Sequence, residues 1–153
     1  LLATWQAAES LGFDSAWVED HFTSPTGQAT APFLEGWTLL TALAAKTSRI
    51  RLGTMTLANS YRHPALVAKM AATLDVISDG RVDLGLGAGW FEREYRAYGI
   101  PFPKTSVRIA QLDEGIEVIR RMWTESSPAF RGAHYTIDGA RVRFGYGGLN
   151  KVA

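Results

Sequence analysis

Three short runs of apolar, strand-like residues recur along the chain, and their spacing most constrains the fold. The runs begin near residues 14, 50 and 81, and one helix-like segment fills each interval. A parallel pair of strands needs a crossover of about this length, whereas a hairpin needs only a few residues. We therefore expect an α/β protein built of βαβ units, with helices covering at least one face of a parallel sheet. Periodicity alone leaves open an eight-stranded barrel and an open doubly wound sheet.

The strand and helix patterns predict where each element lies. Strands are expected at residues 15–18, 50–57 and 82–87. Helices are expected at residues 1–11, 34–46, 64–78, 91–98 and 106–124, and a hairpin at 129–144. Apolar residues at helical spacing mark the expected core: Leu34, Trp37, Leu40, Leu43, Ala44, Leu66, Val67, Met70, Leu74, Ile77, Leu112, Ile116, Ile119 and Trp123. Trp5 and Trp17 are expected there too.

Composition and charge exclude several classes of protein. Of 153 residues, 46% are hydrophobic and 20% are charged, which is typical of a folded domain and not of a disordered segment. The net charge is +1 and the basic residues are scattered, so we expect neither nucleic acid nor a membrane as partner. No apolar run reaches the ~20 residues of a membrane span. The absence of cysteine excludes a thiol nucleophile and fits a cytoplasmic protein.

Function in both candidate folds collects where strands end, and three such places carry reactive or ligand-binding residue types. The first is Asp20 and His21, directly after the strand at 15–18. A histidine at a strand's carboxyl end can donate or accept a proton near neutral pH, and Asp20 could orient it. The alternative interpretation is a loop histidine beside solvated acids.

The second place is the run from Asn59 to Pro64, where a helix begins. A helix N-terminus is a natural anion site, to which Arg62 and His63 add donors. Plain helix capping, with a proline in the first turn, is the alternative. The three histidines have unrelated positions, so we expect no metal site.

The third place is the glycine-rich turn from Gly85 to Trp90. Closely spaced glycines after a strand let a backbone approach a flat or phosphorylated ligand. The turn lacks the third glycine of the dinucleotide-binding fingerprint, and a tight strand-to-helix turn is the alternative. Trp90 is the one tryptophan that we expect to line a pocket.

Four segments, in this order and with these gaps, resemble the luciferase-like flavin and deazaflavin oxidoreductases. They are Gly12–Phe22, Arg49–Thr54, Tyr61–Ala65 and Gly80–Trp90, and the likeness continues through Glu94–Phe102. The resemblance covers residues 1–125, which we expect to form a luciferase-like domain. Residues 126–153 are expected to hold an insertion hairpin and a divergent or truncated tail.

The resemblance implies a partial (β/α)₈ TIM barrel. By that comparison the chain opens inside the family's first helix and carries strands two to four with their helices. Strand one and strands five to eight are expected to be absent from it. The resemblance also implies that the parent protein is an enzyme that acts on a small molecule. It further implies that the parent protein is a homodimer.

The resemblance further implies a cofactor and the residues around it. The implied cofactor is coenzyme F420. A hydride moves between its ring and an unknown small organic substrate, and His21 acts as proton donor or acceptor. Met55 and Thr56 match a strand bulge that often holds a non-proline cis peptide against the ring. The other expected cofactor-binding residues are Asn59, Gly87, Ala88 and Gly89. Trp90 is expected in the substrate pocket. Sugar-phosphate dehydrogenases of the family carry Glu at this position, so the tryptophan disfavours a sugar phosphate as the substrate.

Two alternatives remain open. The parent protein could be a monooxygenase that uses reduced flavin mononucleotide (FMN) and oxygen, because the motifs do not separate the two branches. The chain could also be a non-catalytic barrel fragment, since three strands have open edges with unpaired backbone groups.

Overall fold

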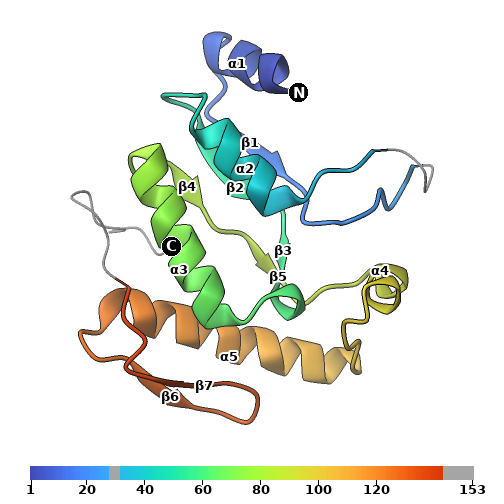
Figure 1. The fold of residues 1–153 in the computed structure, drawn as a ribbon, viewed down its shortest axis with the longest axis vertical. Coiled ribbons are helices and arrows are strands. Elements are labelled where there is room, and N and C mark those ends of the chain that lie inside the picture. The colour runs from blue at the N-terminus through green and yellow to red at the C-terminus, as the bar shows by residue number, and fades with distance from the viewer. Residues whose placement is uncertain (28–31, 143–153) are drawn as a thin grey trace.

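Strands and helices alternate along the chain in the computed structural model, which describes residues 1–27 and 32–142 (Figure 1). In chain order the elements are α1 (Leu2–Ser10), β1 (Ser15–Val18), α2 (Gly36–Ala44), β2 (Arg51–Thr54), β3 (Leu57–Ala58), the 3₁₀-helix η1 (Asn59–Tyr61), α3 (Pro64–Ser78), β4 (Val82–Asp83), β5 (Leu86–Gly87), α4 (Glu92–Ala97), α5 (Thr105–Thr124), β6 (Ala129–Arg131) and β7 (Thr136–Asp138). The expected tail lies outside the described residues from position 143 onward.

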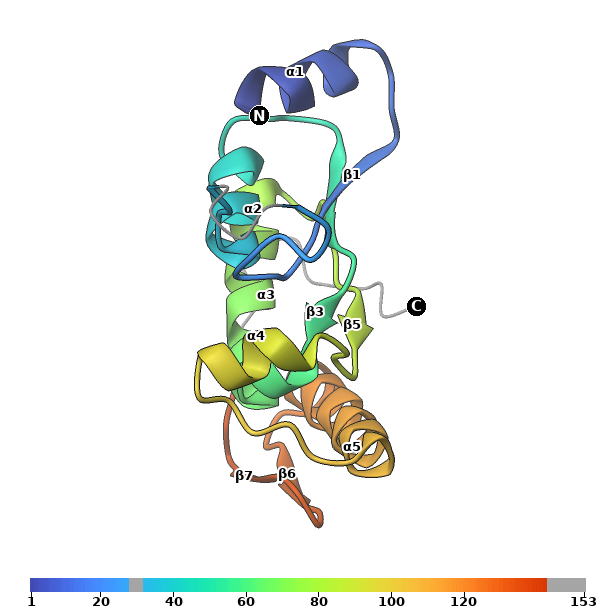
Figure 2. The same ribbon diagram turned by 90° about the vertical axis from the view of Figure 1, so that its right-hand side faces the viewer.

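The strands are parallel, as the spacing of the sequence predicts. β1, β2 and β4 form one sheet in that order, with Trp17 opposite Gly53 and Gly53 opposite Asp83. β3 and β5 form a second parallel pair, which follows β2 and β4 along the chain. Helices α2 and α3 lie side by side over one face of these strands (Figure 1, Figure 2). The parallel βαβ arrangement is therefore confirmed, and the carboxyl ends of the strands point to one edge.

Two of the three expected strands are interrupted, so the expectation of continuous runs is wrong. A cis peptide bond between Met55 and Thr56 separates β2 from β3, at the position that the family resemblance indicates. On the neighbouring strand the Gly85 carbonyl accepts hydrogen bonds from the Thr54 hydroxyl at 2.9 Å and the Leu57 N–H at 2.8 Å. A Cβ on Gly85 would clash with the Thr54 carbonyl, so only glycine fits this close approach.

The core lies between the strands and helices α2, α3 and α5. These expected core residues are buried: Trp5, Trp37, Leu40, Leu43, Ala44, Val67, Leu74 and Ile119. Five others are exposed, contrary to expectation: Trp17, Leu34, Leu66, Ile77 and Ile116. Helix α2 begins only at Gly36, after Leu34. Helix α3 instead buries a face of small residues, Ala68, Ala71 and Ala72, which let it approach its neighbours closely.

Trp17 was expected in the core but lies on the other face of the sheet. Alternate strand residues face opposite sides, so Val18 points toward the helices and Trp17 away from them. The Trp17 side chain is 40% exposed, and its indole covers Gly53 on the adjacent strand. A Cβ on Gly53 would clash with that ring, which explains the glycine in the middle of β2.

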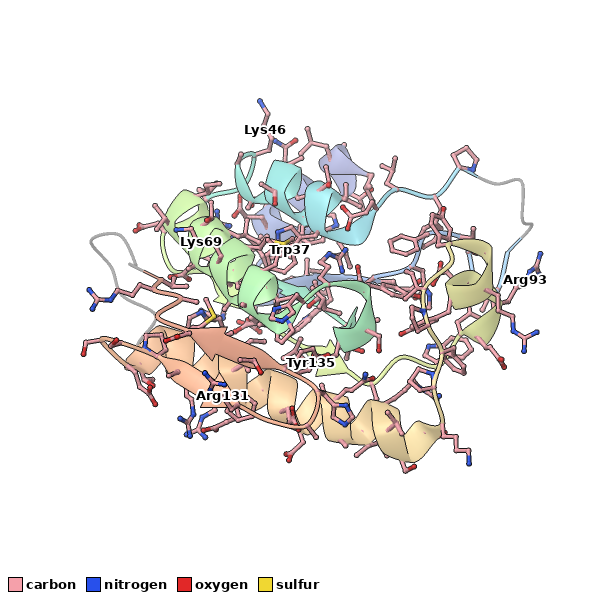
Figure 3. The ribbon with its side chains drawn as sticks, turned by 60° about the horizontal axis from the view of Figure 1, so that its bottom comes forward. Trp37, Lys46, Lys69, Arg93, Arg131 and Tyr135 are labelled. Atoms are coloured by element: carbon pink, nitrogen blue, oxygen red, sulfur yellow. The ribbon has the colours of Figure 1, made fainter. Side chains whose placement is uncertain are left out.

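The hairpin β6–β7 packs against helix α5 and η1. Its loop is held by Glu114 of α5, whose carboxylate accepts hydrogen bonds from the backbone N–H groups of Ala133, His134 and Tyr135. Figure 3 shows Tyr135 turned toward the body of the protein, whereas Lys46, Lys69 and Arg93 point outward. The predicted hairpin is confirmed within residues 129–138.

None of the described helices is long and apolar enough to cross a membrane.

The carboxylate of Glu9 ties α1 to the start of β2. Its Oε1 accepts hydrogen bonds from three consecutive backbone N–H groups, those of Ser48 at 2.9 Å, Arg49 at 2.5 Å and Ile50 at 2.9 Å. The bonds from Ile50 and Arg49, the largest causes, lower the pKa of Glu9 to about 2 against an ordinary 4.5. The ionised carboxylate therefore stabilises the folded state.

Glu9→Gln should remove most of this contribution and lower the free energy of unfolding by about 1 kcal/mol at neutral pH. Because the folded-state pKa of Glu9 is depressed, its contribution is complete above about pH 4.5 and disappears as the pH falls toward 2. The free energies of unfolding of wild type and Glu9→Gln, measured by urea melts, should therefore become equal over that pH range. Asp113→Asn is the control, because it neutralises an exposed carboxylate on α5. Its free energy of unfolding should follow that of the wild type at every pH. A gap between wild type and Glu9→Gln that stays constant down to pH 2 would contradict this account.

Candidate active site

A pocket of about 200 Å³ lies where the segments after β1 and β2 meet the turn after β5. Its lining residues are Asp20, His21, Met55, Thr56, Ala58, Tyr61, Gly89, Trp90 and Phe91. The loops that follow parallel strands meet at one edge of a sheet, so residues far apart in sequence converge there. The pocket therefore occupies the place where α/β proteins usually bind ligands.

Five of the predicted site residues lie in this lining: His21, Met55, Thr56, Gly89 and Trp90. Two of them present apolar side chains to the open side, since Met55 is 61% and Trp90 is 65% exposed. The rings of His21 and Trp90 are nearly perpendicular, with their centroids 5.7 Å apart. The structure thus brings together residues from three separate strand ends, as the sequence predicts.

Asn59, by contrast, lies outside the pocket lining. Its side chain is only 2% exposed, and its amide donates a hydrogen bond to the Tyr135 hydroxyl at 3.0 Å. A Cβ on Gly115 of α5 would clash with the Asn59 side chain, so α5 approaches it closely. These contacts join η1 to α5 and the hairpin, which is a structural role.

Gly87 and Gly89 are packed against the protein's own side chains. A Cβ on Gly87 would clash with the Thr56 hydroxyl, and a Cβ on Gly89 would overlap the Tyr95 hydroxyl. Gly89 also has a φ of +78°, which favours glycine. The close approach expected along Gly87, Ala88 and Gly89 is therefore made here by Thr56 and Tyr95, and only Gly89 of the three lines the pocket.

The carboxylate of Glu94, on α4, holds His21 in place. His21 Nδ1 lies 2.9 Å from Glu94 Oε2, which also accepts a hydrogen bond from the Tyr61 hydroxyl at 2.5 Å. Glu94 Oε1 accepts hydrogen bonds from the backbone N–H groups of Phe22 and of Thr23, the latter at 2.8 Å. The four donors come from two loops, so Glu94 fixes the loop after β1 against η1 and α4.

Glu94 is ionised and Tyr61 is protonated in this network. Burial by itself raises the pKa of Glu94, but hydrogen bonds from Tyr61, His21, Thr23 and Phe22 outweigh it and hold the pKa below its ordinary value. Burial, followed by the hydrogen bond to Glu94, raises the pKa of Tyr61 far above that of a free phenol. Tyr61 therefore acts as a hydrogen-bond donor.

Asp20 precedes His21 in the chain and is engaged in an ion pair with Arg62. Its two oxygens accept hydrogen bonds from Arg62 Nη1 and Nη2, each at 2.9 Å, and Oδ2 also accepts from the Ala58 N–H at 2.9 Å. Arg62 also pairs with Glu35, whose carboxylate caps α2. The network fixes the backbone just beyond the break between β2 and β3, so Asp20 positions the pocket wall.

The two side chains expected to donate to an anion between Asn59 and Pro64 both have partners within the protein. Arg62 is committed to Asp20 and Glu35. His63 Nδ1 accepts a hydrogen bond from the Ala65 N–H at 3.2 Å, and Pro64 occupies the first turn of α3. Plain helix capping, the alternative interpretation of this segment, is what the structure shows.

Aromatic rings hold α4 beside the pocket. Phe22 stacks on Tyr61 with centroids 4.6 Å apart and contacts Tyr98 at 4.5 Å. Tyr95 meets Tyr61 at 4.7 Å and is fully buried. These contacts supply the apolar surroundings in which the Glu94 hydrogen bonds are strong.

Sequence reasoning missed Glu94 and Tyr61. Glu94 lies on a short helix rich in charged residues, and such a pattern predicts a solvent-exposed helix face. It is also 73 residues from His21 in sequence. The available signal was the aromatic residues around it, because Phe91, the N-cap residue of α4, precedes it and Tyr95 follows it. Within residues 1–27 and 32–142, no cluster of three or more His, Cys, Asp or Glu side chains could hold a metal ion.

Comparisons with known proteins confirm the resemblance inferred from the four segments. The sequence model of the luciferase-like monooxygenases matches residues 1–147. The F420-dependent glucose-6-phosphate dehydrogenase of Amycolatopsis mediterranei (strain U-32) is 36% identical over 137 residues, which are 88% of this chain and 40% of that protein.

Two solved structures extend the comparison to the fold. An F420-dependent secondary alcohol dehydrogenase, in complex with an F420-acetone adduct, gives a TM-score of 0.82 at 30% identity over 98% of this chain and 44% of that one. A monooxygenase from Streptomyces bottropensis gives a TM-score of 0.77 at 31% identity over 90% of this chain and 40% of that one. The chain thus spans 40% of the length of the curated relative and similar shares of the two solved structures.

Gly89→Ala should destabilise the protein and close part of the pocket, because the new methyl group would overlap the Tyr95 hydroxyl at a positive φ. We expect a loss of about 3 kcal/mol, of which about 1 kcal/mol reflects the backbone conformation alone. Gly99→Ala is the matched control, because Gly99 has a φ of +68° but a Cβ there would meet no atom of the described chain within 4 Å.

Thermal or urea melts measure both losses. Adding Tyr95→Phe to Gly89→Ala should recover part of the stability, because it removes the overlapping hydroxyl. Equal losses for Gly89→Ala and Gly99→Ala would show that the Tyr95 contact does not constrain the turn.

Proposed function

We propose, because the chain belongs to the luciferase-like monooxygenase family, that the whole protein transfers a hydride between coenzyme F420 and a small organic substrate. The observation that carries this proposal is the position of His21, which lines a pocket together with the exposed apolar side chains of Met55 and Trp90 and is held by a buried carboxylate. The F420-dependent relatives at 30% and 36% identity support the choice of cofactor. We also propose that the chain's parallel strands form part of a (β/α)₈ barrel in the whole protein.

The residues that line the pocket fit a flat aromatic ring. Met55 and Trp90 offer exposed apolar surface, and Thr56 and Gly89 belong to the same lining. The Asp20 carboxylate, although it lines the pocket, is neutralised by Arg62 and so places no unpaired charge beside the ring. Met55, Thr56 and Gly89 would hold the cofactor, with the backbone of Gly87 and Ala88 supporting them. When bound, F420 supplies a ring carbon that accepts or donates the hydride.

His21 moves the proton that accompanies the hydride. It lies at the pocket wall, and its ring is fixed by Glu94 and by the nearly perpendicular rings of Trp90 and Phe91. When an alcohol is oxidised, His21 accepts the hydroxyl proton, and in the reverse direction it donates a proton to the carbonyl oxygen. A fixed ring shortens the search for the reactive geometry, which is the contribution of the protein.

The lining favours an apolar substrate over a sugar phosphate. Trp90 and Phe91 form an aromatic wall beside His21, and none of the nine lining residues is a lysine or an arginine. A phosphate group is held most strongly by lysine or arginine, and neither is among the described residues of this lining. We propose a small alcohol or ketone with apolar substituents, in line with the secondary alcohol dehydrogenase to which the chain is similar.

A monooxygenase that uses reduced FMN and oxygen is the second candidate. The family's name and the 31% identity with a monooxygenase of solved structure favour it. The same pocket would take the FMN ring, and His21 would again handle a proton. Binding of one cofactor and not the other separates the two candidates.

His21→Ala in the whole protein should lower kcat by about 10²–10⁴, because it removes the group that exchanges the substrate proton. The dissociation constant for F420, followed by cofactor fluorescence, should change little, because His21 is not proposed to hold the ring. His134→Ala is the control, since His134 is exposed on the hairpin loop. Saturable binding of FMN with no binding of F420 would favour the second candidate, and full activity of His21→Ala would remove His21 from the mechanism.

A further inference from the structure

We propose that Glu94 is a positioning residue that selects the tautomer of His21. It holds the neutral imidazole with its hydrogen on Nδ1 and leaves Nε2 as the atom that exchanges a proton with the substrate. The inference deepens the proposed function and rests on it for the role of His21 in the reaction. The selection of the tautomer itself follows from the hydrogen bonds around Glu94.

The hydrogen bonds of Glu94 leave only one direction for the contact with His21. Oε1 accepts from the backbone N–H groups of Phe22 and Thr23, and a backbone N–H can only donate. Oε2 accepts from the Tyr61 hydroxyl. An ionised carboxylate has no hydrogen to give, so the 2.9 Å contact with His21 Nδ1 requires the ring to donate.

The second ring nitrogen of His21 is left for the substrate. Nε2 has no hydrogen-bond partner within the described residues, and the ring belongs to the pocket lining. The rings of Trp90 and Phe91 pack nearly perpendicular to the imidazole at centroid distances of 5.7 and 5.8 Å, and these contacts restrict its rotation. A neutral ring with hydrogen on Nδ1 carries its lone pair on Nε2, which is the form needed to accept a substrate proton.

The charge of Glu94 also supports its role in positioning His21. The carboxylate is almost fully buried, and among residues 1–27 and 32–142 its one ion-pair partner is His21. Neither Lys nor Arg of the described chain pairs with it. When Nε2 takes up a proton, the imidazolium therefore forms next to a fixed negative charge, as in other carboxylate–histidine pairs.

A purely structural role for Glu94 makes a different prediction. The two backbone hydrogen bonds would anchor the loop after β1 even if His21 took the other tautomer. The position of the imidazole hydrogen therefore separates selection of the tautomer from anchoring of the loop. It can be observed by NMR without cofactor or substrate, so a failure of the proposed enzyme activity would not affect the result.

The chain contains only three histidines, so a sample labelled with ¹⁵N-histidine gives a spectrum that can be assigned by substitution. Long-range ¹H–¹⁵N correlations above neutral pH report which ring nitrogen carries the hydrogen. We expect His21 in the Nδ1–H form. His63 provides an internal reference, because its Nδ1 accepts from the Ala65 N–H and its neutral ring should be in the Nε2–H form.

Glu94→Gln should reverse the tautomer of His21. The amide oxygen must stay toward the N–H groups of Phe22 and Thr23, so the NH₂ group takes the place of Oε2 and donates to Nδ1. His21 should then carry its hydrogen on Nε2, while His63 keeps its own form. In the whole protein, kcat should fall by about 10²–10⁴ with little change in KM for the cofactor.

Glu114→Gln is the matched control. Glu114 is also a carboxylate that accepts from backbone N–H groups of a loop, but it lies on α5 against the hairpin. It should leave the His21 tautomer and kcat unchanged.

Two results would overturn the proposal. One is an Nε2–H form of His21 in the wild-type chain, which needs no variant and so does not depend on whether Glu94→Gln folds. The other is an unchanged Nδ1–H signal in a folded Glu94→Gln chain, which would leave Glu94 with a structural role only.

Discussion

The carboxylate of Glu94 is the contact on which the rest of the site depends. It lies almost fully buried between the loop after β1, the turn η1 and helix α4, and it accepts a hydrogen bond from each of four donors. A buried carboxylate without hydrogen-bond donors would destabilise the folded state. The loop after β1, η1 and α4 are therefore stable in these positions only together. The same contacts that complete the hydrogen bonding of Glu94 place the imidazole of His21 at the pocket wall.

A second buried carboxylate, Asp20, completes the frame on the other side. It joins Arg62 and the Ala58 N–H, and so connects the end of β1 to the backbone beyond the break between β2 and β3. Glycines allow the remaining close approaches, at Gly85 beneath Thr54 and at Gly89 against Tyr95. The pocket is therefore defined by polar contacts buried among aromatic rings, and Met55 and Trp90 are left exposed on its open side.

The sequence was most informative where a local rule decides the structure. The spacing of strands predicted parallel βαβ units, Gly12 ends α1 with a φ of +88°, and Pro64 starts α3. It was least informative where a partner distant in sequence decides. The fate of Trp17 depends on Gly53 of the next strand, and the core face of α3 depends on which residues its neighbours admit.

The candidate site divides in the same way. His21 and Trp90 could be singled out because they directly follow strand-like runs, and the cis bond at Met55–Thr56 because the segment resembles a known bulge. Glu94 and Tyr61 could not, because their role exists only once residues 73 and 33 positions apart meet. Asn59 is buried and joins η1 to the hairpin through Tyr135, and its contact with a cofactor stays a prediction.

Isotope tracing is the sharpest test of the proposal that this pocket supports transfer of a hydride to or from F420. The whole protein would be incubated with oxidised F420 and small secondary alcohols deuterated at the carbinol carbon, isopropanol first, and the reduced cofactor analysed by mass spectrometry. We predict that one deuterium moves from the alcohol to the cofactor as the ketone forms, with no consumption of oxygen. Oxygen consumption with reduced FMN, and no deuterium in F420 with any alcohol, would contradict the account and indicate a monooxygenase.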